Sequence, residues 1–221
     1  MDPDRRVILF DVNQTLLDLG PLAPLFAETL GSPETMREWF ARLLHGSLVA
    51  NHLEAYRPFG EIGVDILTAM AKARGREVSP GRLAEVAGTI RQLPPHPEVP
   101  EALARLSAAG HRLAALTNSS PDALRAQMEN AGLGAHFERL ISVEEVGIYK
   151  PAPEPYRHAL QIMEVEPGEA MMVAAHDWDV LGAQAVGIMG VFLARPGVVW
   201  SIPDSRPDLV APDLAALVQA G

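Results

Sequence analysis

The hydrophobic positions follow two different patterns along the chain. In the stretch "VILFDVNQTLLD", residues 7–18, four consecutive apolar residues end abruptly at Asp11. A short apolar run of this kind is typical of a strand buried on both faces, in a parallel sheet covered by helices. Similar runs at residues 113–116, 140–143, 171–175 and 191–193 alternate with helical segments. This alternation predicts βαβ units and therefore an α/β fold.

The segment from about residue 22 to 92 has helical patterning and no convincing strand. Apolar side chains recur there at the i, i+3, i+4 spacing of an amphipathic helix, at Met36, Trp39, Phe40, Leu43 and Leu44. For Met36 and Trp39 this spacing favours packing in a core over contact with a ligand. Three prolines within positions 94–97 cannot continue a helix and end the segment.

These patterns predict a Rossmann-like, doubly wound parallel sheet formed by residues 1–18 and 95–221. Residues 19–94 are expected to form a helical cap domain inserted after the first strand. In open α/β sheets the ligand crevice lies beyond the carboxyl ends of the strands, which is where Asp11 stands. A single aspartate at that position is more typical of a residue that caps the next turn.

Composition narrows the classes of partner. The chain has 28 acidic and 18 basic side chains, a formal net charge of −10, so it offers no basic stripe for nucleic acid. It has no cysteine, which excludes disulfides, thiolate metal sites and cysteine nucleophiles. No apolar run approaches the length of a membrane span or of a signal peptide. We therefore expect a cytoplasmic protein that acts on a small molecule and binds neither nucleic acid nor a membrane.

Four polar clusters follow the predicted strands, and their joint occurrence favours a functional site. They consist of Asp11 with Asn13 and Thr15; Thr117, Asn118, Ser119 and Ser120; Lys150 with Tyr156; and His176, Asp177 and Asp179. The second cluster opens a helix with Pro121 near its first position, and free N–H groups at such a helix start bind anions. One lysine among three carboxylates predicts a charge centre at this edge of the sheet.

The same clusters carry a resemblance to a known family. "FDVNQTLLD", "LTNSSP", "YKPAPEPY" and "WDVLGAQAVG" resemble, in order and spacing, four motifs of the haloacid dehalogenase superfamily, and in particular of the L-2-haloacid dehalogenases. The resemblance implies that Asp11 is a covalent nucleophile, with Lys150 holding it ionised and Asp179 positioning Lys150. It also implies that Thr117 and Asn118 bind the substrate carboxylate or the developing oxyanion, and we expect Asn13, Phe40 and Tyr156 to contact the substrate.

Phosphatases of this superfamily use magnesium, and two positions of this chain differ from them. The second aspartate, which protonates a phosphatase's leaving oxygen, is here Asn13, which has no proton to give. The carboxylate that a phosphatase has five residues before Asp179 is here Ala174, so a hard cation loses an oxygen ligand unless Asp177 replaces it. We therefore predict a reaction without metal or cofactor.

The chain also departs from the dehalogenases. The arginine that cradles the halide in that family corresponds to Phe40, and neither Arg37 nor Arg42 points in the same direction on a helix. A family serine corresponds to Ala174 and a family asparagine to His176. His176 is either a base that activates the hydrolytic water or a structural histidine bonded to a loop carbonyl.

The leading interpretation is a hydrolase that displaces halide from a small 2-halocarboxylic acid through an aspartyl ester. Three alternatives stay open: a magnesium-dependent phosphatase, a hydrolase that opens a strained ring such as azetidine-2-carboxylate, and a non-catalytic binding protein. The substrate, its stereochemistry and the oligomeric state are not fixed by the sequence, and a homodimer is one state that it leaves open.

Overall fold

A single parallel sheet forms the centre of the molecule. The computed structural model describes residues 7–219, so residues 1–6 of the predicted sheet domain, and residues 220 and 221, lie outside the described part. The six strands lie in the order β3-β2-β1-β4-β5-β6, and all neighbours pair in parallel. Their bounds are Val7–Phe10 (β1), Arg112–Thr117 (β2), Arg139–Ser142 (β3), Ala170–Ala174 (β4), Met189–Leu193 (β5) and Leu209–Ala211 (β6). The predicted Rossmann-like fold is confirmed, and β1 occupies a central position.

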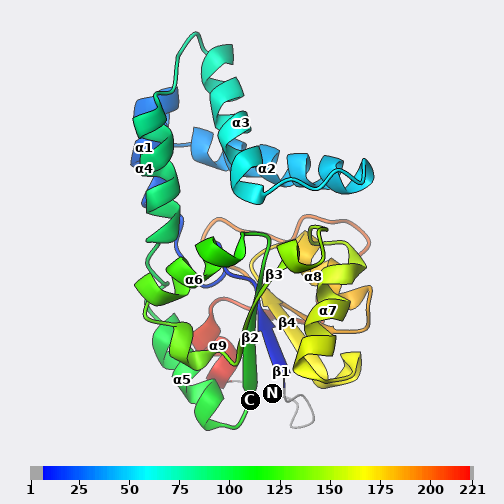
Figure 1. Ribbon diagram of the computed structural model, residues 1–221. Coiled ribbons are helices and arrows are strands. Elements are labelled where there is room, and N and C mark those ends of the chain that lie inside the picture. The colour runs from blue at the N-terminus through cyan, green and yellow to red at the C-terminus, as the bar shows by residue number, and fades with distance from the viewer. Residues whose placement is uncertain (1–6, 220–221) are drawn as a thin grey trace.

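Helices cover both faces of this sheet (Figure 1). Successive side chains of a strand point to opposite faces, so Ile8 and Phe10 of β1 belong to one core cluster and Val7 and Leu9 to the other. The covering helices are α5 (Val99–Ala108), α6 (Pro121–Asn130) and α9 (Leu214–Gln219) on the first face, and α7 (Pro153–Met163) and α8 (Asp177–Gln184) on the second. Short 3-10 helices lie at Gly134–His136, Val143–Glu145 and Pro167–Glu169.

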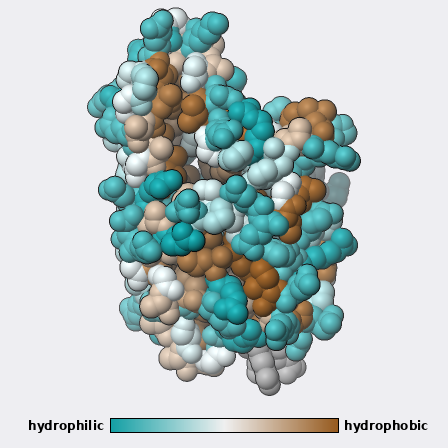
Figure 2. All heavy atoms as spheres, viewed as in Figure 1, coloured by the Kyte–Doolittle hydropathy of each residue, from teal (hydrophilic) through white to brown (hydrophobic). Residues whose placement is uncertain are grey.

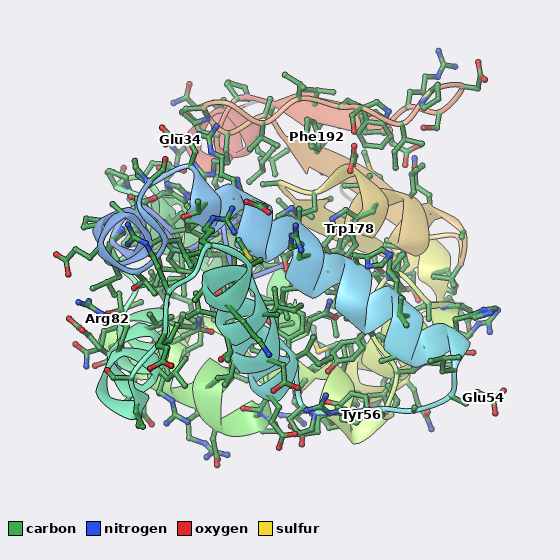
Figure 3. All side chains as sticks on the ribbon, turned by 90° about the horizontal axis from the view of Figure 1, so that it is seen from above. Glu34, Glu54, Tyr56, Arg82, Trp178 and Phe192 are labelled. Carbon is green, nitrogen blue, oxygen red and sulfur yellow. The ribbon has the colours of Figure 1, made fainter. Side chains whose placement is uncertain are left out.

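Four further helices, which we call the cap helices, stand over the carboxyl ends of the strands (Figure 1). They are α1 (Leu22–Leu30), α2 (Thr35–His52), α3 (Phe59–Ala73) and α4 (Pro80–Arg91). Hydrophobic residues gather on the visible side of the cap between α4 and α3 (Figure 2). Seen from above, α2 crosses the molecule between Glu34 and Glu54 and passes beside Trp178 (Figure 3). This helix therefore forms a roof over the ends of the strands.

The two chain segments that join the cap helices to the sheet run next to each other. The Asp18 N–H donates to the Pro94 carbonyl at 2.8 Å, and the His96 N–H donates to the Leu16 carbonyl at 2.9 Å. The cap is also tied to the sheet domain by the Gln127 amide, which donates to the Ile90 carbonyl at 3.0 Å. These bonds fix the cap helices over the strand ends. Within residues 7–219, no helix is long and apolar enough to cross a membrane.

Candidate active site

Asp11 lies directly after the central strand and is held by a tight loop. Its N–H donates to the Val173 carbonyl at 3.1 Å, which continues the sheet pairing by one residue. The loop then turns at Gln14, whose φ of 67° lies in the left-handed region, and brings Thr15 back towards the strand. The Thr15 hydroxyl donates to Asp11 Oδ2 at 2.6 Å and accepts the Ala175 N–H at 2.9 Å. The Asp11 carboxylate is thereby fixed in orientation before any ligand arrives.

Lys150 connects Asp11 to Asp179. Its ammonium donates to Asp11 Oδ1 at 2.9 Å and to Asp179 Oδ2 at 2.6 Å. The third donor goes to the Leu116 carbonyl at 2.9 Å, so all three ammonium hydrogens are used. The side chain of Lys150 is 1% exposed, and its attraction to the carboxylates is therefore little screened by water. The predicted charge centre is present with two of its three carboxylates, since Asp177 bonds Ser201 instead.

Burial and the neighbouring charges act in opposite directions on this cluster. Burial raises the pKa of Asp11, but the attraction of Lys150 and His176 and the hydrogen bond from Thr15 outweigh it, and the pKa lies below its ordinary value of 3.8. Burial also disfavours the charged form of Lys150, yet the two carboxylates raise its pKa above the ordinary 10.5. Burial and the negative charge of Asp11 raise the pKa of Asp179. Asp11 is thus the carboxylate that the cluster keeps ionised most strongly.

Tyr156 lies behind Asp179 rather than beside the cavity above Asp11. Its hydroxyl donates to Asp179 Oδ1 at 2.5 Å, and its side chain is fully buried. A Cβ at Gly182 would come within 2.6 Å of this hydroxyl, so the glycine allows α8 to pack closely against the ring. The place of Tyr156 therefore differs from the expected substrate contact, and the geometry suits a residue that positions Asp179.

The segment after β2 supplies polar groups on the other side of Asp11. Thr117 Oγ1 accepts the Ser119 N–H at 3.2 Å, and the Ser120 side chain caps α6 by accepting the Ala123 N–H at 3.3 Å. Asn118 Oδ1 accepts the Lys150 N–H at 3.1 Å, while its Nδ2 is buried and has no partner among the described residues. A buried donor without a partner costs free energy unless a ligand supplies an acceptor.

His176 approaches Asp11 from the start of α8. Its Nε2 lies 3.6 Å from Asp11 Oδ2 and 3.3 Å from the Asn13 carbonyl oxygen. The ring stacks on Trp178, with centroids 5.2 Å apart, and its centroid lies 5.6 Å from that of Phe40. The contact with a loop carbonyl and the short distance to Asp11 agree with both expectations for this residue.

A small cavity of about 10 Å³ lies over Asp11, and residues of α2 and α3 form part of its wall. It is lined by Asp11, Asn13, Phe40, Leu44, Phe59, Thr117, Asn118, His176 and Trp178. A wider cleft of about 520 Å³ shares Phe40 and His176 with it and is bordered by Arg37 and Arg195. We call the first the catalytic cavity and the second the entrance cleft. Aromatic rings thus enclose a carboxylate, with cationic side chains further out.

Comparison with known proteins identifies this arrangement. The family model of the haloacid dehalogenase-like hydrolases matches residues 5–187. The chain belongs to this family. Over 96% of this chain and 92% of the relative, it is 28% identical to an (S)-2-haloacid dehalogenase of Pseudomonas sp. strain YL. It is also 30% identical to a phosphoserine phosphatase of Thermus thermophilus, over 95% of this chain and 96% of the relative. The resemblance inferred from the motifs is confirmed.

A solved structure extends the likeness to a covalent complex. The L-2-haloacid dehalogenase of Xanthobacter autotrophicus with chloropropionic acid covalently bound matches this chain with a TM-score of 0.89 and 26% identity. The match covers 97% of each chain. This haloacid dehalogenase-like hydrolase therefore shares its fold with a dehalogenase whose structure was solved with the acid covalently bound.

The acidic residues of this family member do not fit a magnesium site of the phosphatase kind. Within the described residues 7–219, no group of three or more His, Asp or Glu side chains is placed to hold a metal ion. Asp177, the candidate replacement ligand, accepts the Ser201 N–H at 3.0 Å and the Ser201 hydroxyl at 2.5 Å. Its carboxylate is thus committed to the loop that follows β5, and Ala174 contributes no oxygen from its side chain.

Asn13 is also committed, although it lines the catalytic cavity. Its Nδ2 donates to Ser119 Oγ at 3.2 Å, and its Oδ1 accepts the Gln127 amide at 2.9 Å. These two bonds fix the side-chain amide between the loop after β1 and α6. Asn13 is therefore held where a general acid would stand in a phosphatase, without being one.

Sequence patterns missed several lining residues of the catalytic cavity. Leu44, Phe59 and Trp178 line it and were not assigned to the site. Thr15, which donates to Asp11, was also not assigned to the site, although it stands in the first polar cluster. Trp178 lies inside the last quoted motif, between Asp177 and Asp179, which is a signal that could have identified it. The apolar residues give no such signal, because core and ligand-facing positions have the same spacing on a helix.

Proposed function

We propose that the protein hydrolyses the carbon–halogen bond of a 2-halocarboxylic acid without a metal ion, with Asp11 as the nucleophile. The observation that carries the proposal is that Asp11 is ionised and oriented, while the side chain of Asn13 is engaged in hydrogen bonds. Asp11 is oriented by Lys150 and Thr15, whereas the amide of Asn13 is engaged by Ser119 and Gln127. The site thus has a prepared nucleophile and no acid at the phosphatase position, which suits a leaving group that departs as a stable anion.

In the first half of the reaction, an Asp11 oxygen attacks the α-carbon of the acid. A new carbon–oxygen bond forms, the carbon–halogen bond breaks, and the halide leaves with the bonding electron pair. Asn118 Nδ2, buried and without a partner, is placed to donate to the substrate carboxylate or to the departing anion, and Thr117 lies beside it. Phe40, Phe59 and Trp178 keep the reacting carbon away from bulk water.

In the second half, water attacks the carbonyl carbon of the Asp11 ester. The bond between that carbon and the ester oxygen breaks, the leaving alkoxide takes up one of the two protons of the water, and a 2-hydroxy acid is released while Asp11 returns to its carboxylate form. His176 Nε2, 3.6 Å from Asp11 Oδ2, is near enough to receive the proton that the water loses. Lys150 remains a cation throughout and stabilises the charge that builds up on the ester oxygen. Tyr156 and Asp179 act on the reaction only by holding Lys150.

The proposal is tested by measuring free halide from a panel of 2-chloro and 2-bromo acids, each with and without EDTA. We expect halide release that EDTA does not change and that Asp11→Asn removes. Azetidine-2-carboxylate and p-nitrophenyl phosphate with magnesium form the other arms of the panel. Phosphate release that requires magnesium, with no halide from any acid, would overturn the proposal.

The route of hydrolysis has its own measurement. With enzyme in excess over substrate in ¹⁸O-labelled water, one turnover through the ester places the label in Asp11 rather than in the 2-hydroxy acid. Peptide mass spectrometry locates it. Label found in the product after a single turnover, with none in Asp11, would exclude the ester. The expected cytoplasmic location and a homodimeric state remain predictions, which fractionation and light scattering check.

A further inference from the structure

A second cavity, which we call the cap cavity, lies among the cap helices next to the catalytic cavity. Its volume is about 90 Å³, and all four cap helices line it. Among these helices α2 packs on α3, and α1 packs on both α2 and α4, so the cavity lies inside the four-helix group. Its base is Asn13, two residues after the nucleophile. The mechanism proposed above does not use this space.

The cap cavity offers a ligand no free polar group from its lining side chains. Apart from Trp39, Asn13 is the one lining residue with a polar side chain, and its amide is bound to Ser119 and Gln127. The Trp39 indole N–H donates to the Gly63 carbonyl at 2.8 Å, so this ring presents only its hydrocarbon surface. The rest of the lining consists of aliphatic or phenyl side chains and glycine. An apolar cavity of this kind excludes water and accepts hydrocarbon.

Three residues belong to the lining of both cavities, namely Asn13, Phe40 and Phe59. The two cavities therefore adjoin at these residues, and a chain attached to the α-carbon above Asp11 would reach the cap cavity past them. Phe40 also borders the entrance cleft, so it lies where all three spaces meet. One water needs about 10–15 Å³ in this measure of volume, and about 90 Å³ therefore accepts several carbon atoms.

We infer that the cap cavity receives the hydrocarbon side chain of the substrate, and that the preferred substrate is a 2-halocarboxylic acid with an unbranched chain of about three to five carbons beyond the α-carbon. This inference rests on the proposed function and adds the class of acid to it. The carboxylate and the halogen lie against Asn118 and Asp11, and the catalytic cavity, about 10 Å³ in this structure, has to widen to hold them. The chain replaces empty space beside Trp39, Leu67 and Val86.

The test compares kcat/KM for halide release from 2-bromopropanoate, 2-bromobutanoate, 2-bromohexanoate and 2-bromooctanoate. We expect a rise of about fourfold per methylene, which corresponds to about 0.8 kcal/mol, up to the hexanoate, followed by a fall. Equal values across the series, with 2-bromopropanoate still hydrolysed, would overturn the inference and leave the proposed function standing. Release from no acid at all would overturn the proposed function instead.

Variants of the cap cavity make the test specific. Val86→Phe fills the space from α4, and Leu67→Phe fills it from α3, so that one of the two serves if the other fails to fold. Each is expected to lower kcat/KM for 2-bromohexanoate by about tenfold or more, as the loss of two or three buried methylenes implies, and to leave 2-bromopropanoate nearly unchanged. Leu67→Ala enlarges the cavity and should move the optimum to a longer acid. Ala84→Phe, on the exposed side of α4, is the matched control.

A binding measurement keeps the inference testable without turnover. Titration calorimetry compares 2-hydroxyhexanoate with lactate, two unreactive acids that differ in chain length. Tighter binding of the longer acid, lost in Val86→Phe and retained in Ala84→Phe, supports the inference. Equal affinity of both acids for the unmodified protein would overturn it.

Discussion

The side chain of Asn51 in α2 pairs with both backbone groups of Tyr149, the residue before Lys150. Asn51 Nδ2 donates to the Tyr149 carbonyl and Oδ1 accepts the Tyr149 N–H, each at 2.9 Å. The Tyr149 ring also stacks on Tyr56, with centroids 5.0 Å apart. The cap helices therefore hold the residue that precedes Lys150, so the position of the cap and the position of Lys150 are linked.

We expect Asn51→Ala to weaken this link. Loss of two hydrogen bonds at about 0.5–1.5 kcal/mol each should lower kcat/KM by about 5-fold to 150-fold, through a higher KM and a lower kcat, because Lys150 loses part of its support. Steady-state kinetics with a 2-halo acid measure both constants. Asn130→Ala is the control, since Asn130 also bonds the cap, at the Arg91 carbonyl, while its other hydrogen bond goes to Ala126 and not to the segment of Lys150. Equal effects of the two variants would mean that Asn51 supports the cap in general and not the lysine.

Asp11→Asn is expected to abolish turnover and leave the fold intact. The amide is nearly the same size as the carboxylate but a far weaker nucleophile, and loss of a nucleophile costs about 10³-fold or more. Circular dichroism and thermal unfolding check the fold, and halide release checks the rate. Full activity in a preparation whose mass confirms the substitution would exclude the covalent route.

Lys150→Ala should cost more activity than Lys150→Arg. The alanine variant leaves Asp11 and Asp179 buried without a cation, whereas arginine retains the charge in a different shape. We expect a fall of about 10²–10³-fold for alanine and a loss of about 3–5 kcal/mol in the free energy of unfolding at neutral pH. Urea unfolding and kinetics measure the two effects. Rates close to that of the unmodified protein in both variants would show that the cation is not needed.

The pH dependence follows from the lowered pKa of Asp11. A carboxylate whose pKa is lower in the folded state contributes stability above its ordinary value of 3.8 and loses it as the pH falls through the folded value. Asp11 is therefore ionised across the neutral range, and the acid limb that it contributes to the pH profile of kcat/KM should lie below 3.8. In Lys150→Met the attraction is gone while burial remains, so the limb should move to higher pH. The fraction of enzyme alkylated at Asp11, measured at each pH, reports the ionisation of Asp11 in both proteins. The same midpoint pH in the two proteins would contradict this account.

The structure brings together the polar residues that the sequence singled out, and each of them follows a local rule. Asp11, Asn118, Lys150 and His176 stand where a strand or turn ends, and such positions have a recognisable composition. Strand β6 was missed because its three residues form a short edge strand with two exposed positions, which gives no alternating pattern. A window along the chain detects periodicity, and three residues are too few for it.

Contacts between distant segments could not be predicted in the same way. Asn51 and Tyr149 are 98 residues apart, and nothing in the local sequence of either predicts their hydrogen bonds. Phe40 fits the amphipathic spacing of its helix, and only the packed structure places it between the catalytic cavity, the cap cavity and the entrance cleft. Such positions depend on how helices pack, for which a single sequence contains no direct signal.

His176 is expected to act when water opens the Asp11 ester and not in the first displacement. Its Nε2 lies 3.6 Å from Asp11 Oδ2, and stacking on Trp178 fixes its ring, whereas halide departure requires no base. His176→Ala and His176→Asn should therefore slow ester hydrolysis about 10²-fold and leave ester formation nearly unchanged. Quenched-flow measurement would then show a burst of one halide per enzyme, and mass spectrometry would find the modified Asp11 peptide. His158→Asn, at a histidine paired with Glu145, is the control. If the His176 variants show neither a burst nor a slower steady state, the histidine only holds the Asn13 loop, from which its Nε2 is 3.3 Å away.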